Sequence, residues 1–115
     1  MAWDRRYGEF VQELLADLGE VRIRPMFGGA GVFSGELMFG LLFEDTLYLR
    51  GDDENEPALK AAGARQFVYA PKNGEASPMR YWSLPDTAAD DPDEAVAWAR
   101  GSLAAAARKK TGKRN

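Results

Sequence analysis

Two runs of carboxylates are the residues of this chain whose type and spacing could most directly do chemistry. The first run is Asp52-Asp53-Glu54, and the second combines Asp90-Asp91 with Asp93-Glu94. Carboxylates that converge in a cleft can hold Mg²⁺ or share acid–base work. Both runs lie where a helix is predicted to begin, and acidic side chains there cap free backbone N–H groups. Capping is therefore the favoured interpretation, and we expect no catalytic residue, no metal site and no cofactor.

Most other catalytic machinery is excluded by composition. The chain contains no cysteine and no histidine, so it cannot build a Cys/His zinc site, a Ser-His-Asp triad or a disulfide. We predict that the protein is not an enzyme, since a carboxylate or a tyrosine would have to carry any activity. The charged residues from Asp4 onward and the short apolar runs predict a cytoplasmic protein without a membrane span.

The glycine-rich segment Phe27-Gly28-Gly29-Ala30-Gly31 could cradle a phosphate through its backbone N–H groups. However, it does not open a predicted helix and has no P-loop lysine. We interpret it as a bend or bulge between strands, where small residues admit close neighbours.

Cations beside aromatic rings form a second possible binding surface. Its members are Arg22, Arg24, Lys72, Arg80, Tyr81 and Trp82. Such a surface can stack single-stranded nucleic acid, and Tyr, Trp and Arg also dominate protein–protein hot spots. Because the net charge is −3, the chain is a poor match for phosphate backbones, and a protein partner is favoured. Tyr81 and Trp82, beside prolines, are the predicted exposed anchors.

Positive charge is concentrated near the end of the sequence. The cations are Arg108, Lys109, Lys110, Lys113 and Arg114. They could bind nucleic acid nonspecifically, or they could simply interact favourably with the dipole at the C-terminal end of a helix. We expect a single domain over residues 1–108 and a basic, disordered tail over residues 109–115.

The predicted elements follow the order α-β-β-β-β-α-β-β-α. An amphipathic helix over residues 4–18 precedes a strand meander over 21–50, in which the apolar run 37–43 is a central strand with two apolar faces. A helix over 54–62 follows, then a hairpin of strands 66–69 and 79–84 around Asn73-Gly74. The last helix is predicted to start at Asp91-Pro92 and to end near Arg108. Antiparallel strands interrupted by helices indicate an α+β two-layer sandwich.

A series of short motifs lies along these elements. Met26-Phe27-Gly28-Gly29, with Gly31 just beyond, is followed by residues 35–41, 47–49, 67–69 and 79–82. In this order, over about residues 13–107, they resemble the N-terminal domain of the TfoX/Sxy family of competence regulators. The positions that carry the resemblance are Met26, Phe27, Gly28, Gly29, Gly31, Met38, Tyr48, Tyr69 and Tyr81.

The resemblance implies an antiparallel sheet flanked by helices and a link to bacterial gene regulation. Full-length members act with a cyclic-AMP-responsive activator and carry a second, C-terminal domain, which we expect this chain to lack. We therefore expect a non-enzymatic regulatory or protein-interaction module whose partner is another protein, such as part of the transcription machinery. A nucleic-acid accessory using the basic tail is the alternative, and a small-ligand-binding domain is a weaker one. A homodimer through an edge strand or the last helix is also open.

Overall fold

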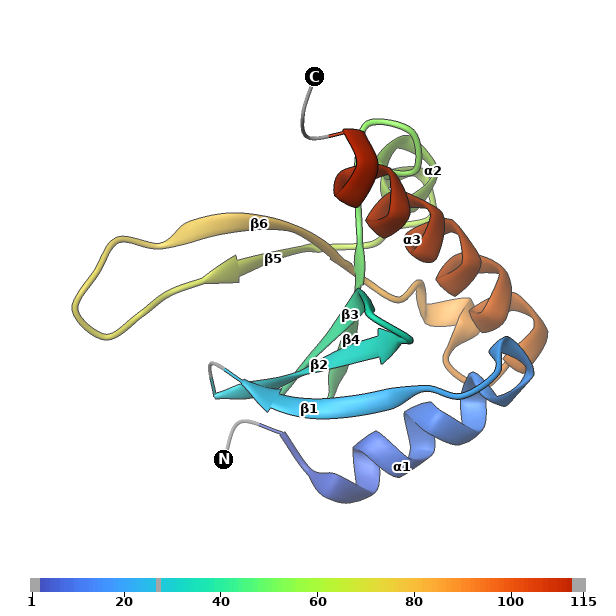
Figure 1. Ribbon diagram of the computed structural model, residues 1–115. Helices are drawn as coiled ribbons and strands as arrows, with labels where there is room; N and C mark the ends of the chain where they lie inside the picture. Colours follow the sequence, from blue (N-terminus) through green and yellow to red (C-terminus); the bar gives the residue numbers. More distant parts are fainter. Residues whose placement is uncertain (1–2, 27, 113–115) are drawn as a thin grey trace.

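An antiparallel sheet of six strands organises the computed structural model, which describes residues 3–26 and 28–112 (Figure 1). The strand order is β1-β2-β3-β4-β6-β5, so β1 and β5 are the edges. The strands are β1 (Arg22–Met26), β2 (Gly29–Ser34), β3 (Leu37–Phe43), β4 (Thr46–Arg50), β5 (Gln66–Tyr69) and β6 (Ser77–Ser83). The β5–β6 hairpin projects away from the helices, at the left of Figure 1. The predicted α+β class and element order are confirmed.

Two helices cover one face of the sheet. Apolar residues of α1 (Arg5–Leu14) and α3 (Pro92–Gly112) pack in one cluster with side chains of β2, β3 and β4. The short helix α2 (Glu56–Ala61) connects β4 to β5, and single 3₁₀ turns follow α1 (Ala16–Leu18) and β6 (Asp86–Ala88). The core therefore lies between the helices and one face of the sheet, as expected for two layers.

Strand β3 is apolar on both faces, as its sequence predicts. The register between β2 and β3 shifts so that Val32 lies opposite Gly40 and Phe33 opposite Met38, which leaves Phe39 without an opposite residue. Phe39 and Leu42 belong to the cluster beneath the helices. Met38, Leu41 and Phe43 belong to a separate apolar cluster. The bulge thus puts Phe39 on the same face as Leu42, which strict alternation along the strand would separate.

Helix α3 begins as predicted but ends later. Asp91 Oδ1 accepts the Glu94 backbone N–H at 3.2 Å, which is the expected N-terminal cap. At the other end the helix continues to Gly112, so residues 109–112 are helical rather than disordered. An ion pair of Lys110 with Glu36, at 3.2 Å, ties this last turn to the β2–β3 turn. Lys113, Arg114 and Asn115 lie outside the described residues.

The length of α3 does not make it a membrane span. Among the residues that the structure describes, no helix combines the length and the apolar character that crossing a bilayer requires.

Candidate functional site

The sheet face opposite α1 and α3 carries an apolar groove of about 400 Å³. We call it the open-face groove. All six strands contribute to its lining, which consists of Met26, Gly29, Met38, Leu41, Phe43, Arg50, Phe67, Tyr69, Met79 and Tyr81. Of these described residues, Arg50 alone carries a charge. A concave, mostly apolar surface with a single charged group has the composition of a binding site.

Alternation along the strands explains why these side chains meet. In β4, Leu47 and Leu49 point under the helices, so Tyr48 and Arg50 must point to the other face. In β2, a Cβ atom on Gly31 would stand 2.8 Å from the Phe33 ring and 3.0 Å from the Met26 side chain. Because Gly31 has no side chain, Phe33 and Met26 can pack closely over β2 at this position.

Arg50 is held in the groove from two sides. Its guanidinium carbon lies 5.4 Å from the centre of the Tyr81 ring, a cation–π distance. Its backbone oxygen accepts hydrogen bonds from Ser102 Oγ of α3 at 2.8 Å and from Asn55 Nδ2 at 2.9 Å. These bonds fix the end of β4, so the position of Arg50 depends on residues distant in sequence.

The predicted exposed anchors Tyr81 and Trp82 are buried, at 6% and 7% exposure. The reason is that β6 lies between β4 and β5 rather than at the sheet edge. Tyr81 forms part of the groove wall, whereas the Trp82 indole N–H donates to Glu56 Oε2 at 2.9 Å. The exposed anchors of this hairpin are instead Tyr69, at 37%, and Met79, at 40%.

The four cations of the predicted surface do not come together. Arg22 and Arg24 flank the Phe33 ring beside β1, at the opposite end of the strand order from β5. Lys72 is exposed in the turn between β5 and β6. Arg80 is bound by carboxylates, with Nη2 at 2.6 Å from Glu56 Oε1 and 2.7 Å from Asp53 Oδ1. These residues therefore do not form the single basic and aromatic surface that the sequence suggested as one possibility.

The acidic run at residues 52–54 holds a tail cation in place. Asp52 Oδ1 accepts the backbone N–H groups of Glu54 and Asn55 in the turn before α2. The predicted cap of this helix is wrong, because its N-cap residue is Asn55, which makes no capping hydrogen bond with its side chain. The Asp52 carboxylate also pairs with Arg108, at 2.7 Å from Nε, and Glu54 adds a contact at 3.3 Å. Arg108 is therefore already partnered within the fold. Within residues 3–26 and 28–112, neither this run nor any other group of three acidic side chains is placed to hold a metal.

The hydrogen bond from Arg108 lowers the pKa of Asp52 from 3.8 to about 2. Ionised Asp52 therefore stabilises the fold fully above pH 3.8, and this contribution disappears as the pH falls to about 2. We expect Asp52→Asn to lower the free energy of unfolding by about 1 kcal/mol near neutral pH. This cost is smaller than the pKa shift alone would imply, because the ion pair is partly exposed and solvent screens it. Urea titrations across this range should show the difference between variant and parent shrinking toward zero in acid.

Asp90→Asn is the matched control for that experiment, because Asp90 is exposed at the turn before α3. We expect it to leave the unfolding free energy within about 0.5 kcal/mol at every pH. A cost of Asp52→Asn that stayed constant down to pH 2 would contradict the role given to the Arg108 pair.

The remaining shifted groups do not form a catalytic set. Burial raises the pKa of Tyr7, which keeps this hydroxyl protonated and makes it a weaker acid. The Arg80 guanidinium holds the pKa of Glu56 below its usual range. In the described part of the chain, these groups are explained by burial or ion pairing, and they do not line the open-face groove.

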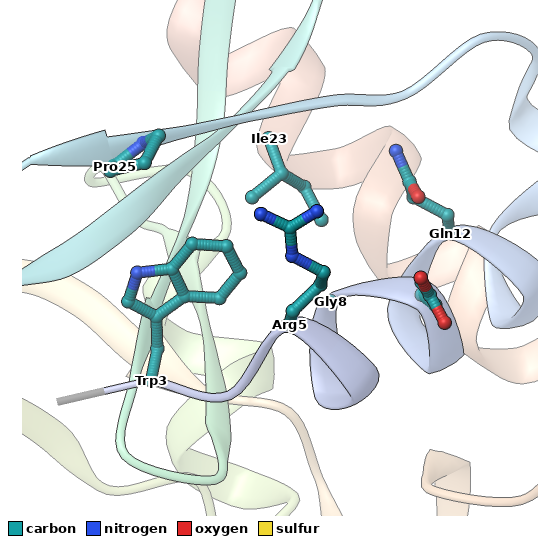
Figure 2. Close-up of a pocket in the computed structure, with 7 residues that line it drawn as sticks. Trp3, Arg5, Gly8, Gln12, Ile23 and Pro25 are labelled. Atoms are coloured by element: carbon teal, nitrogen blue, oxygen red, sulfur yellow. The ribbon is translucent and has the colours of Figure 1, made fainter. Parts of the chain in front are cut away.

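A second hollow, of about 390 Å³, separates the start of α1 from β1 (Figure 2). Trp3 and Arg5 line it from one side, and Ile23 and Pro25 line it from β1. A Cβ atom on Gly8 would stand only 3.0 Å from the Trp3 ring, which shows that the indole packs directly on α1. This hollow is therefore a seam where α1 rests on the edge strand.

The family of the chain follows from a comparison with known domains. The sequence profile of the TfoX N-terminal domain matches residues 13–106. The chain belongs to the TfoX N-terminal domain family. One relative is the DNA transformation protein TfoX1 of Aliivibrio fischeri, which is 33% identical over 69 residues. That alignment covers 60% of this chain and 31% of the relative, so the two share less than a third of the relative's length.

Most residues that carry the resemblance to TfoX N-terminal domains meet on the open face of the sheet. Those that line the groove are Met26, Gly29, Met38, Tyr69 and Tyr81. Tyr48 packs against the same cluster, and Gly31 lies beneath Met26. Gly28 makes the turn into β2 with a φ of +77°, and Phe27 lies outside the described residues.

Sequence reasoning missed Arg50 and Glu56 as residues that shape the site. The alternation in Leu47-Tyr48-Leu49-Arg50 is a usable signal for Arg50, because it puts this side chain on the same face as Tyr48. Glu56 gave no comparable signal, since its partners Arg80 and Trp82 are 24 and 26 residues away.

Proposed function

We propose that the protein is a non-enzymatic interaction module in gene regulation that binds another protein through the open-face groove. The observation that carries the proposal is the groove itself, an apolar surface that the two helices leave uncovered. Tyr69 and Met79 line it from the projecting hairpin, with more than a third of each residue exposed. Exposed apolar surface that gathers in one place is typical of interaction sites.

Membership in the TfoX N-terminal domain family supports a regulatory role. The name of the relative from Aliivibrio fischeri refers to DNA transformation, and we extend only the regulatory context to this chain. The partner we favour is a protein of the transcription machinery.

The alternative of a nucleic-acid accessory has less support, since Arg80 and Arg108 are held by carboxylates within the fold. Fewer cations remain to displace counterions from a phosphate backbone.

A site-specific photo-crosslinker tests the proposal. We would place p-benzoylphenylalanine at position 79, which lines the groove and is exposed, and as a control at position 100, which is exposed on α3. Irradiation in bacterial cells should give a crosslinked protein from position 79 but not from position 100, and mass spectrometry should map the bond to a regulatory protein. Equal crosslinking from both positions would contradict the groove as the binding surface. Crosslinks mainly to nucleic acid would favour the accessory alternative.

A further inference from the structure

Arg50 is an unusual residue for the open-face groove. Its Nε atom is buried and has no hydrogen-bond partner within the described residues. Arginine is rarely left without a partner in an apolar environment, because removing charge and N–H donors from water is costly. The Tyr81 ring offsets part of this cost but accepts no conventional hydrogen bond from the guanidinium.

Nearby carboxylates are engaged with other cations. Asp52 pairs with Arg108, and Glu56 and Asp53 pair with Arg80. Arg50 forms no ion pair in the part of the chain that the structure describes. Its guanidinium therefore remains available to a carboxylate from outside the fold.

The open face has a positive bias even though the chain is acidic. Arg22 and Arg24 lie opposite Phe33 and Gly31 in the β1–β2 register, and opposite residues of an antiparallel pair share a face. By the same pairing, Met26 and Gly29 lie on this face, and both line the groove. Three arginines thus share the groove face, while the ten lining residues include no Asp or Glu.

We infer that the open-face groove takes a peptide segment of the partner in which apolar side chains flank a carboxylate, and that this carboxylate binds Arg50. The inference rests on the proposed function and specifies its partner. Small-molecule sites enclose most of their ligand, whereas this groove is bordered by exposed Tyr69 and Met79. An apolar lining with one cation also suits a peptide better than a nucleic acid, which needs repeated phosphate contacts.

The expected size of the effect follows from the charged hydrogen bond. A carboxylate binds a guanidinium more strongly than a neutral amide does, because both partners of the hydrogen bond are charged. We expect a groove-binding peptide with Glu to bind about tenfold more tightly than the same peptide with Gln.

Selection from a displayed library of random peptides tests the inference on the intact chain. Peptides selected on the parent protein should be enriched in Asp or Glu beside apolar residues. Selection on Arg50→Gln should lose the acidic enrichment, and selection on Arg100→Gln should retain it, because Arg100 is an exposed cation on α3. A Leu41→Asp variant, changed within the groove, should lose the apolar enrichment as well. Leu41 is buried, so Met79→Asp, at an exposed lining residue, takes its place if circular dichroism shows that Leu41→Asp does not fold.

Each outcome separates the two proposals. If peptides depend on Leu41 but show equal acidic content with and without Arg50, the carboxylate inference is overturned while groove binding stands. If no selected peptide depends on Leu41, the groove does not bind peptides and both proposals fail. Should Arg50→Gln not fold by circular dichroism, the Glu and Gln forms of one selected peptide are compared on the parent protein, and equal affinity overturns the inference. If light scattering shows a dimer and Leu41→Asp dissociates that dimer, a second copy of the chain occupies the groove. This result would also overturn the carboxylate inference.

Discussion

Gly29→Ala is expected to lower the free energy of unfolding by about 3 kcal/mol, because strand β2 has no room for a side chain at this position. A Cβ atom there would collide with the backbone carbonyl oxygen of Leu42 in the neighbouring strand. It would also stand 3.2 Å from the Phe43 ring. A backbone oxygen in a paired strand cannot rotate away, so either the β2–β3 pairing or the groove wall must move.

Gly101→Ala is the matched control, since it makes the same chemical change in a different setting. Gly101 lies inside α3, and no atom stands within 4 Å of where its Cβ would be. Alanine should therefore stabilise the helix by about 1 kcal/mol. Urea denaturation of both variants checks the pair of expectations. If both variants changed the free energy of unfolding equally and in the same direction, the close approach of Leu42 to Gly29 would not limit which residue fits at position 29.

Glu56→Ala is expected to cost about 2 kcal/mol, because it removes the acceptor shared by two side chains of β6. Glu56 accepts from Arg80 Nη2 at 2.6 Å and from the indole N–H of Trp82 at 2.9 Å. Arg80 is half exposed and can be hydrated, but Trp82 is only 7% exposed. The buried indole N–H would therefore lose its partner, and the contact between α2 and β6 should loosen.

Asp53→Ala provides the comparison for Glu56, since Asp53 bonds the same arginine at 2.7 Å. Its side chain is 96% exposed, so solvent screens this ion pair. We expect it to cost less than about 0.5 kcal/mol in the same denaturation experiment. If both variants lost stability equally, the Trp82 hydrogen bond would not be the source of the effect.

Local signals in the sequence predicted the order of the elements. The apolar period of residues 4–18, the prolines and glycines between segments and the cap at Asp91 each act over a few residues. Their effects are therefore readable without knowing the fold. The two apolar faces of β3 were predicted in the same way, from the run of residues 37–43. The family was predicted from ordered motifs, and the profile match over residues 13–106 confirms it.

Partner choice among charged residues was not predictable. Arg108 pairs with Asp52, 56 residues away, and Arg80 pairs with Glu56, 24 residues away. Judged from the sequence alone, many carboxylates could form an ion pair with each arginine equally well. Only the positions of β6, α2 and α3 bring particular ones within reach. The same pairs engage Arg80, from the surface that the sequence suggested for binding, and Arg108, from the basic residues suggested for nucleic acid.

By itself, therefore, the sequence determined the element order, the family and the absence of histidine and cysteine chemistry, because these depend on composition and on neighbours along the chain. The tertiary structure alone decided that β6 lies inside the sheet, which buries Tyr81 and Trp82 and leaves Tyr69 and Met79 exposed. It also decided that Arg50 enters an apolar groove lined from all six strands. Burial and side-chain encounters depend on strand order, and strand order is set by long-range pairing that no short stretch of sequence records.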